Sequence, residues 1–251
     1  MALPRRTKGL KTALVAIVAL ATAAACAGSA SSERPGAFDY WILALSWSPQ
    51  FCRAQPSSEQ CETARGFIVH GLWPQHERGY PESCGQRERV PDELIERMSP
   101  LMPSATLVNG QWRKHGTCSG LDMKDYFFNV ERAWRTVVVP PEYRDMQTTM
   151  HTSVRDIENR FIELTPGLTR ESVAVQCSGR WLREVRICLD RDFRPRACGL
   201  DVEDRCRSEV HIRPVRGRVV RRRPKKIIPN QKRLGIMRAP SAWGYSSAGR
   251  A

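Results

Sequence analysis

The sequence predicts a single α+β domain, with a mainly antiparallel sheet and packed helices, cross-linked by disulfides. Strand-like and helix-like hydrophobic patterns follow one another without internal repeats over residues 38–217. That stretch of about 180 residues is large enough for a substantial core. It also holds eight of the nine cysteines, an even number that suits a disulfide framework in an oxidising compartment.

The strands are predicted from apolar runs. Residues 40–47 alternate large apolar and small side chains, a pattern typical of a strand. Residues 173–177 and 181–189 are two further runs separated by Ser-Gly-Arg, which predicts a hairpin. Residues 210–215 favour a last strand before the C-terminal segment.

Three helices are predicted. Proline followed by acidic residues starts a helix over residues 91–100. Asp122 is the expected N-cap of a helix over residues 122–135, and a third helix over 153–164 stops at Thr165-Pro-Gly. The apolar positions of the last two helices fall on one face: Tyr126, Phe127, Val130 and Trp134 in one, Val154, Ile157, Phe161 and Leu164 in the other.

The N-terminal segment is predicted to be an export signal. In residues 1–27 a basic start precedes an alanine-rich apolar run that is too short for a comfortable membrane span. Two processing routes fit: cleavage after Ala27, or a lipoprotein signal over residues 1–25 that leaves a lipid anchor on Cys26. Residues 28–37 would then form a flexible lead. We expect no transmembrane segment, and a secreted or periplasmic/cell-envelope location.

The formal net charge of +14 is concentrated near the C-terminus. Residues 207–251 carry 13 of the 40 lysines and arginines and a single acid, whereas residues 27–206 are close to neutral. We predict that residues 218–251 form a solvated, disordered tail. The alternative is that this tail holds an anionic polymer through salt-sensitive contacts.

Two short stretches carry the functional signal. Residues 67–75 read Phe-Ile-Val-His-Gly-Leu-Trp-Pro-Gln, and residues 112–118 read Trp-Arg-Lys-His-Gly-Thr-Cys. They place His70 and His115 in near-matching settings, and paired imidazoles suggest an acid and a base acting across one reacting bond. Lys114 supplies a fixed positive charge for a developing oxyanion or phosphorane. The residues therefore indicate a metal-free site for phosphoryl transfer or hydrolysis.

These stretches resemble the two active-site signatures of the ribonuclease T2 family. The resemblance extends from Tyr40-Trp-Ile-Leu-Ala-Leu-Ser-Trp-Ser-Pro-Gln-Phe-Cys52 to Leu182-Arg-Glu-Val-Arg-Ile-Cys188 and covers roughly residues 38–217. It implies a secreted endoribonuclease without metal or other cofactor, acting on single-stranded RNA. The 2′-hydroxyl would attack its own phosphorus, giving a 2′,3′-cyclic phosphate and later a 3′-phosphate. A monomer is the default expectation.

The resemblance also implies a role for each residue. His115 would act as the base on the 2′-hydroxyl, His70 as the acid on the leaving 5′-oxygen, and Lys114 would neutralise the phosphate oxygens. Trp73 would either pack against the His70 segment or line the phosphate pocket. Two further aromatic residues are candidates for stacking an RNA base, with core packing as the alternative: Tyr40 and Trp47.

One departure from the family stands just before Trp112. Family members commonly carry His-Glu there, whereas this chain has Gly110-Gln111. Gly110 removes an imidazole that would help to hold the phosphate. Gln111 keeps a hydrogen-bonding side chain without the carboxylate, so we expect a working but weakened enzyme with an altered acid limb in its pH profile. The alternative function is a catalytically weakened RNA- or polyanion-binding protein on the same fold.

The cysteine pairing is also implied by the resemblance, because the sequence alone permits 105 pairings of eight cysteines. The implied bridges are Cys52–Cys61, Cys84–Cys118, Cys177–Cys206 and Cys188–Cys198. Zinc is the competing interpretation of these cysteines, but the chain has no Cys-x-x-Cys or His-x-x-x-His spacing.

Overall fold

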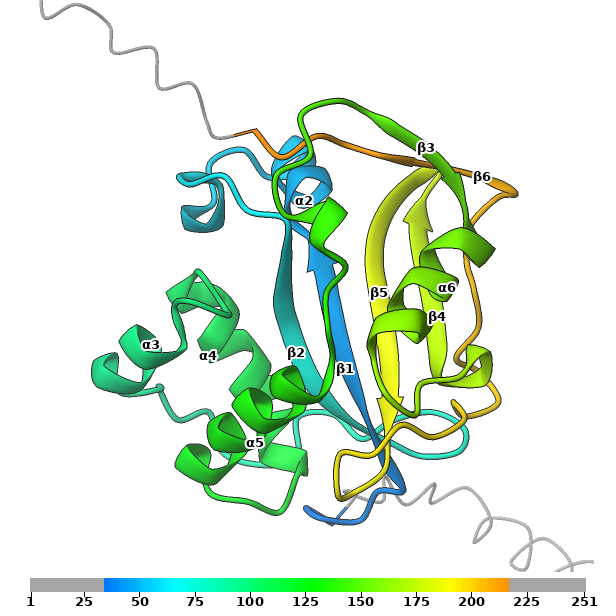
Figure 1. The fold of residues 1–251 in the computed structure, drawn as a ribbon. Helices are drawn as coiled ribbons and strands as arrows, with labels where there is room; N and C mark the ends of the chain where they lie inside the picture. Colours follow the sequence, from blue (N-terminus) through cyan, green and yellow to red (C-terminus); the bar gives the residue numbers. More distant parts are fainter. Residues whose placement is uncertain (1–33, 217–251) are drawn as a thin grey trace, which may run out of the picture. The chain divides into compact units, whose positions relative to one another are not determined.

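The computed structural model describes residues 34–216 (Figure 1). The predicted export signal, Cys26, most of the predicted lead and the basic tail lie outside the described residues. Within residues 34–216, no helix is long and apolar enough to cross a membrane.

A six-stranded sheet forms the centre of the domain, with strand order β2-β1-β5-β6-β3, and β4 pairs with β5 outside this order. Every strand pair is antiparallel except the short parallel contact between β5 and β6. The predicted α+β class with a mainly antiparallel sheet is therefore confirmed. The strands are β1 (Tyr40–Trp47), β2 (Phe67–Gln75), β3 (Met150–Ser153), β4 (Val173–Ser178), β5 (Trp181–Leu189) and β6 (Glu209–Ile212).

The helices fall into two groups around this sheet (Figure 1). Helices α4 and α5 contact β2, whereas α6 contacts β3 and β4. The helices are α2 (Ser48–Ala54), α3 (Asp92–Met98), α4 (Ala105–Lys114), α5 (Met123–Thr136) and α6 (Val154–Leu164). Short 3-10 turns cover Glu59–Cys61, Gly116–Cys118, Pro141–Tyr143 and Arg170–Ser172.

Caps confirm the predicted starts of α5 and α6, whereas α3, predicted over residues 91–100, spans Asp92–Met98 without a side-chain cap. The Asp122 side chain accepts a hydrogen bond from the Asp125 amide at the start of α5. Ser153 and Asp156 form a reciprocal capping box at the start of α6. Tyr126, Phe127 and Phe161 are buried on these helices as predicted, whereas Trp134 is only partly buried, and α6 ends at Leu164 as expected.

Four of the helices and strands were not predicted: β2, β3, α2 and α4. β2 carries Gly71 and Pro74, which usually interrupt a strand, but β2 is an edge strand paired only with β1 and so tolerates proline. In α4 the interior Gly110 weakens the helical pattern in the sequence. The helix is capped by Ser104, whose hydroxyl accepts a hydrogen bond from the Leu107 amide.

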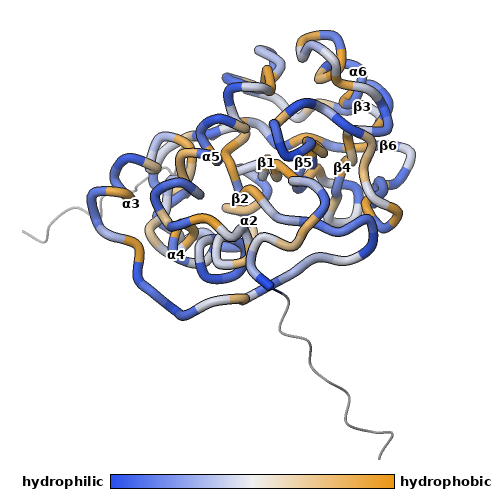
Figure 2. Tube along the Cα trace, turned by 90° about the horizontal axis from the view of Figure 1, so that it is seen from below, coloured by the Kyte–Doolittle hydropathy of each residue, from blue (hydrophilic) through white to orange (hydrophobic). Residues whose placement is uncertain are grey.

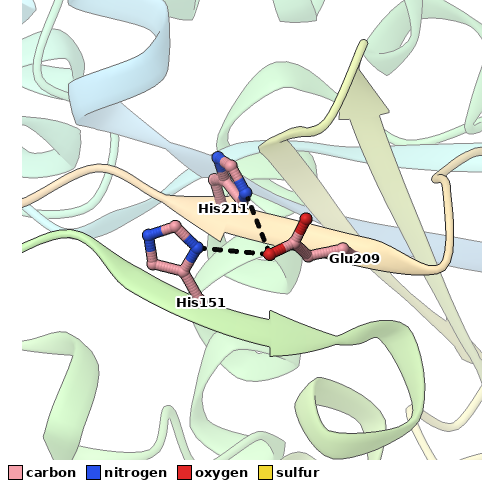
Figure 3. A group of neighbouring side chains, drawn as sticks. All are labelled: His151, Glu209 and His211. Carbon is pink, nitrogen blue, oxygen red and sulfur yellow. Dashed lines mark hydrogen bonds and ion pairs between the residues drawn. The ribbon is translucent and has the colours of Figure 1, made fainter.

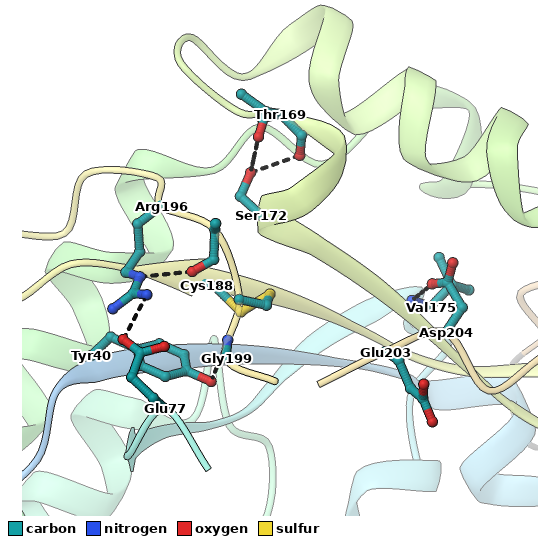
Figure 4. Close-up of a disulfide and its surroundings, with 12 residues drawn as sticks. Tyr40, Glu77, Thr169, Ser172, Val175, Cys188, Arg196, Gly199, Glu203 and Asp204 are labelled. Atoms are coloured by element: carbon teal, nitrogen blue, oxygen red, sulfur yellow. Dashed lines mark hydrogen bonds and ion pairs between the residues drawn. A yellow bond between two sulfur atoms is a disulfide. The ribbon is translucent and has the colours of Figure 1, made fainter. Parts of the chain in front are cut away.

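All four disulfides implied by the family resemblance are present. Cys188 lies on β5, and its bridge to Cys198 fixes the segment that follows this strand (Figure 4). In that segment the Gly199 amide donates a hydrogen bond to the Tyr40 hydroxyl, and Arg196 pairs with Glu77. The bridge therefore ties the end of β5 to the start of β1.

The main core lies between the sheet and the helices. Hydrophobic residues are concentrated in the central strands, and the residues of the surrounding loops are largely hydrophilic (Figure 2). All eight residues of β1 are buried, because this strand runs between β2 and β5 and is covered on both faces.

Candidate active site

His70 is placed by an irregularity in the β1–β2 ladder. Ala44 pairs with Gly71 and Leu45 pairs with Val69, which leaves His70 as the extra residue of a β-bulge. Bulges re-aim a side chain and are common next to active sites. Here the bulge leaves the His70 side chain 38% exposed in a stretch of buried neighbours.

A buried carboxylate holds the His70 ring. Nδ1 of His70 lies 2.6 Å from Oε2 of Glu184 on β5, and Arg186 donates from Nε to the other carboxylate oxygen at 2.9 Å. Burial alone would raise the pKa of Glu184. The hydrogen bond and charge of His70, together with Arg186, outweigh burial and lower this pKa to about 2. Glu184 is therefore a permanent anion that orients the imidazole of His70.

His115, unlike His70, is buried and has no carboxylate partner on its ring within residues 34–216. It caps the C-terminus of α4 and is only 5% exposed. Burial, reinforced by the charges of Lys114 and His70 and opposed by Glu184, lowers the pKa of His115 to about 3. Nδ1 of His115 is buried and has no hydrogen-bond partner among the described residues. His115 is therefore a neutral imidazole at all but strongly acidic pH.

Trp73 connects the two histidines. Its ring stacks on His115 at 5.1 Å between centroids and meets the edge of His70 at 5.2 Å. Its Nε1 donates to Oε1 of Gln111 at 2.7 Å. The indole is nearly buried and packs between the imidazoles, and it also borders a pocket beside His70, so the structure is compatible with both of its expected roles.

Both histidines are followed by a glycine for a steric reason. A Cβ atom at Gly71 would lie 2.0 Å from Oε1 of Gln111 and would displace the bond between Gln111 and Trp73. A Cβ atom at Gly116 would lie 2.3 Å from the Trp112 ring. Gly71 thus allows the two segments to approach closely, whereas Gly116 makes room for the Trp112 ring of its own segment.

Lys114 is half-exposed beside this pair. Its Nζ lies 3.0 Å from Oε2 of Glu82 and 5.4 Å from the centre of the Tyr80 ring. The hydrogen bond to Glu82 raises the pKa of Lys114. The Cys84–Cys118 bridge joins the segment that contains Tyr80 and Glu82 to the end of α4. Lys114 is therefore a permanent cation, with Glu82 as its partner in this structure.

Two pockets flank His70. One has a volume of about 720 Å³ and extends from His70 toward Gln60 and the start of α4. The other, of about 320 Å³, is bounded by Trp73, Glu184 and Arg186. Both include His70, Ser46 and the half-buried ring of Phe51. A chain that passes His70 could therefore place one unit on each side of it.

Tyr40 and Trp47 have no exposed ring face on which a base could stack, so the expectation that they stack a base is wrong. Both are fully buried. The Tyr40 hydroxyl accepts a hydrogen bond from Gly199 (Figure 4), and Nε1 of Trp47 donates to the Arg213 carbonyl. The exposed aromatic residue at the site is Tyr80, whose ring centroid lies 6.2 Å from that of His115.

The prediction from sequence missed Glu184, Arg186 and Tyr80. Glu184 did leave one signal: it is an acid flanked by Arg183 and Val185 in a run that is mostly apolar and was assigned to a strand. A carboxylate at such a position needs a partner. Its partner is 114 residues away in sequence, so local patterning could not identify it.

This site has the composition of an acid–base centre: two imidazoles in contrasting environments, a carboxylate that orients one of them and a neighbouring lysine. A family model described as "Ribonuclease T2 family" matches residues 38–198. The chain belongs to the ribonuclease T2 family.

Among curated relatives, a ribonuclease from Aeromonas hydrophila is 49% identical over 92 residues, which cover 36% of this chain and 42% of that protein. A probable ribonuclease from Haemophilus influenzae is 33% identical over 120 residues, which cover 41% of this chain and 44% of the relative. The chain thus spans less than half the length of these two relatives. Ribonuclease MC1 from bitter gourd seeds shares the fold, with a TM-score of 0.56 at 20% identity over 69% of this chain and 99% of that one.

Proposed function

We propose that this protein is a metal-independent endoribonuclease that cleaves single-stranded RNA by transphosphorylation. The observation that carries the proposal is the contrast between the two histidines on either side of Trp73. His70 is partly exposed and paired with the Glu184 carboxylate, whereas His115 is buried and uncharged. Such a pair can hold a proton on one ring and accept a proton on the other.

In the proposed reaction, His115 removes the proton of the ribose 2′-hydroxyl while the 2′-oxygen forms a bond to the adjacent phosphorus. The bond from phosphorus to the 5′-oxygen breaks, and His70 donates its proton to that oxygen. The products are a 2′,3′-cyclic phosphate and a free 5′-hydroxyl, and water then opens the cyclic ester to a 3′-phosphate. The nucleophile is already part of the substrate, so no metal is needed to generate it.

Charge at the phosphate is balanced by Lys114 in this proposal. For Lys114 to reach a phosphate oxygen, it exchanges its contact with Glu82 for the substrate. Both side chains are about half-exposed, so this exchange costs little. DNA is not a substrate, because it lacks the 2′-hydroxyl.

The two pockets beside His70 are proposed to hold the nucleotides on either side of the scissile phosphate. Phe51 borders both pockets, and Tyr80 lies beside His115, so these rings replace Tyr40 and Trp47 as candidates for stacking. A variant of ribonuclease MC1 was solved in complex with 5′-UMP, which supports a nucleotide-sized ligand in this fold.

We also propose that the protein acts outside the cytoplasm, either secreted or in the periplasm or cell envelope. Four disulfides in residues 34–216 support an oxidising compartment. Release after Ala27 and lipidation at Cys26 remain the two alternatives for the N-terminus, and a monomer remains a prediction.

The test is cleavage of a single-stranded RNA oligonucleotide in EDTA, with the product ends identified by mass spectrometry. Cyclic phosphate ends are expected from the parent protein and from a His76→Gln control, and not from the His70→Ala/His115→Ala variant. Tight RNA binding without cleavage by the correctly bridged protein would reject the proposal in favour of the binding-protein alternative.

A further inference from the structure

A second group of histidines lies on the opposite edge of the sheet, in strands β3 and β6 (Figure 3). His151 on β3 is directly opposite His211 on β6 in the antiparallel register. Glu209 is two residues before His211, so both side chains emerge on the same face of β6. The pairing of two short strands thus brings two imidazoles and a carboxylate together.

The spacing of these groups is that of metal ligands. Oε1 of Glu209 lies 3.3 Å from Nδ1 of His151 and 3.4 Å from Nε2 of His211. The three ligand atoms all lie within 4.8 Å of one another. Zinc binds imidazole nitrogen and carboxylate oxygen at about 2.0–2.2 Å, which places neighbouring ligands of a tetrahedron about 3.3–3.5 Å apart. Two of the three ligand separations therefore already match a tetrahedral zinc site.

A buried nitrogen of His211 that has no hydrogen bond among the described residues also indicates a metal site. Nε2 of His211 is buried, and among the described residues it has no hydrogen-bond partner; the Glu209 oxygen at 3.4 Å does not meet hydrogen-bond geometry. Buried polar atoms in native proteins are nearly always satisfied. A cation between the three groups would satisfy this nitrogen and bind Oε1 at the same time.

The surroundings hold one ligand in place and leave the others adjustable. The His211 side chain is 12% exposed, and the Trp181 ring packs edge-on against it, with Arg213 over that indole. His151 and Glu209 are more than half exposed, so small rotations can complete the geometry and water can provide a fourth ligand. Nη1 of Arg180 lies 3.7 Å from the other oxygen of Glu209 and leaves Oε1 available.

We propose that His151, Glu209 and His211 bind a zinc ion that cross-links strands β3 and β6. These strands come from segments about 60 residues apart and share only a four-residue ladder, so a shared ion would add stability to this edge of the sheet. The site shares no residue with the His70–His115 pair and does not depend on the proposed ribonuclease activity.

The test is a calorimetric titration of the full-length, disulfide-bonded protein with zinc chloride, combined with thermal unfolding with and without the ion. We expect one zinc equivalent and a rise in the unfolding temperature. His151→Gln and Glu209→Gln change exposed side chains, and each should weaken zinc binding at least tenfold and abolish the thermal shift. The matched control, His76→Gln, should bind zinc like the parent protein.

Zinc could instead bind the catalytic histidines, so the titration is repeated on the His70→Ala/His115→Ala variant. Unchanged binding there supports the proposal, whereas loss of binding there overturns it. The proposal is also overturned if the parent protein binds no zinc, or if either His151→Gln or Glu209→Gln keeps the parent affinity. RNA cleavage in EDTA by His151→Gln should equal that of the parent, which separates failure of this site from failure of the proposed function.

Discussion

Replacing Gln111 with glutamate tests how the residue beside the catalytic histidine sets the pH range of the enzyme. The Gln111 side chain is buried and accepts a hydrogen bond from Trp73, whose ring stacks on His115. A carboxylate can accept the same bond, so Gln111→Glu changes the charge while it preserves the packing. It adds a negative charge four residues before His115 along the same helix.

The size of the effect follows from Coulomb's law. Side chains four residues apart on a helix are separated by about 6 Å, and at an effective dielectric constant of about 20 two opposite charges attract by about 3 kcal/mol, or roughly two pKa units. Burial would keep part of the new carboxyl groups protonated and reduce this effect. We therefore expect the pKa of His115 to rise from about 3 by roughly one to two units.

The assay is kcat/KM for a short RNA oligonucleotide from pH 3 to 7, with circular dichroism at each pH to confirm that the protein is folded. The acid limb of this profile reports the base in the free enzyme, so it should move to higher pH by roughly one to two units in Gln111→Glu. Gln147→Glu adds the same charge in an exposed turn and should leave the limb in place. Overlaid profiles of Gln111→Glu and the parent would refute the proposed coupling.

Four further predictions concern the same site. Glu184→Gln should lower kcat at least tenfold with little change in KM, because the carboxylate that orients His70 is lost. Steady-state kinetics measures both constants, and an unchanged kcat would contradict this prediction. The folded protein keeps His115 uncharged down to a pH of about 3, whereas the unfolded chain protonates it below about 6.5. Acidification between these values therefore lowers the free energy of unfolding by about 1.4 kcal/mol per pH unit for this side chain. His115→Asn should flatten that slope in urea unfolding from pH 6.5 to 4, and an equally steep slope in the variant would count against the buried neutral imidazole. A side chain at Gly110 meets nothing within 4 Å, so Gly110→Ala should stabilise the protein by about 0.5–1 kcal/mol in the same assay. Gly110→His should in addition lower KM for RNA, and equal KM values for the two variants would reject a phosphate-holding role for an imidazole there.

Local sequence signals predicted local structure well. The N-cap at Asp122, which was predicted, and the start of the helix at residue 153 both depend on side chains within three residues of the helix start. The 173–189 hairpin likewise depends on one short turn. By contrast, β2 combines glycine, proline and a bulge, and its strand identity depends on β1, which lies some 30 residues earlier in the chain.

The difference between local signals and long-range contacts also explains which site residues were predicted. His70, His115 and Lys114 stand in short contiguous stretches, so their neighbours reveal them. The failure at Tyr40 and Trp47 arises because an aromatic side chain in a strand is equally compatible with base stacking and with core packing, and here all eight residues of β1 are buried. Glu184 and the His151–Glu209–His211 group are formed by contacts 58 to 114 residues apart, and no local pattern encodes such contacts.

The roles proposed for the two histidines follow from their environments rather than from their motifs, which are nearly alike. His70 lies on a bulge with solvent on one side and a permanent carboxylate on the other, so a positive charge on this ring would have a partner while the ring acts as an acid. His115 lies beneath Trp73 beside a permanent lysine charge, so its environment disfavours positive charge and leaves a ring that can accept a proton. Exchanging the two roles would require His115 to hold a buried positive charge next to Lys114 before the reaction starts. That requirement is the physical reason to assign the base to His115 and the acid to His70.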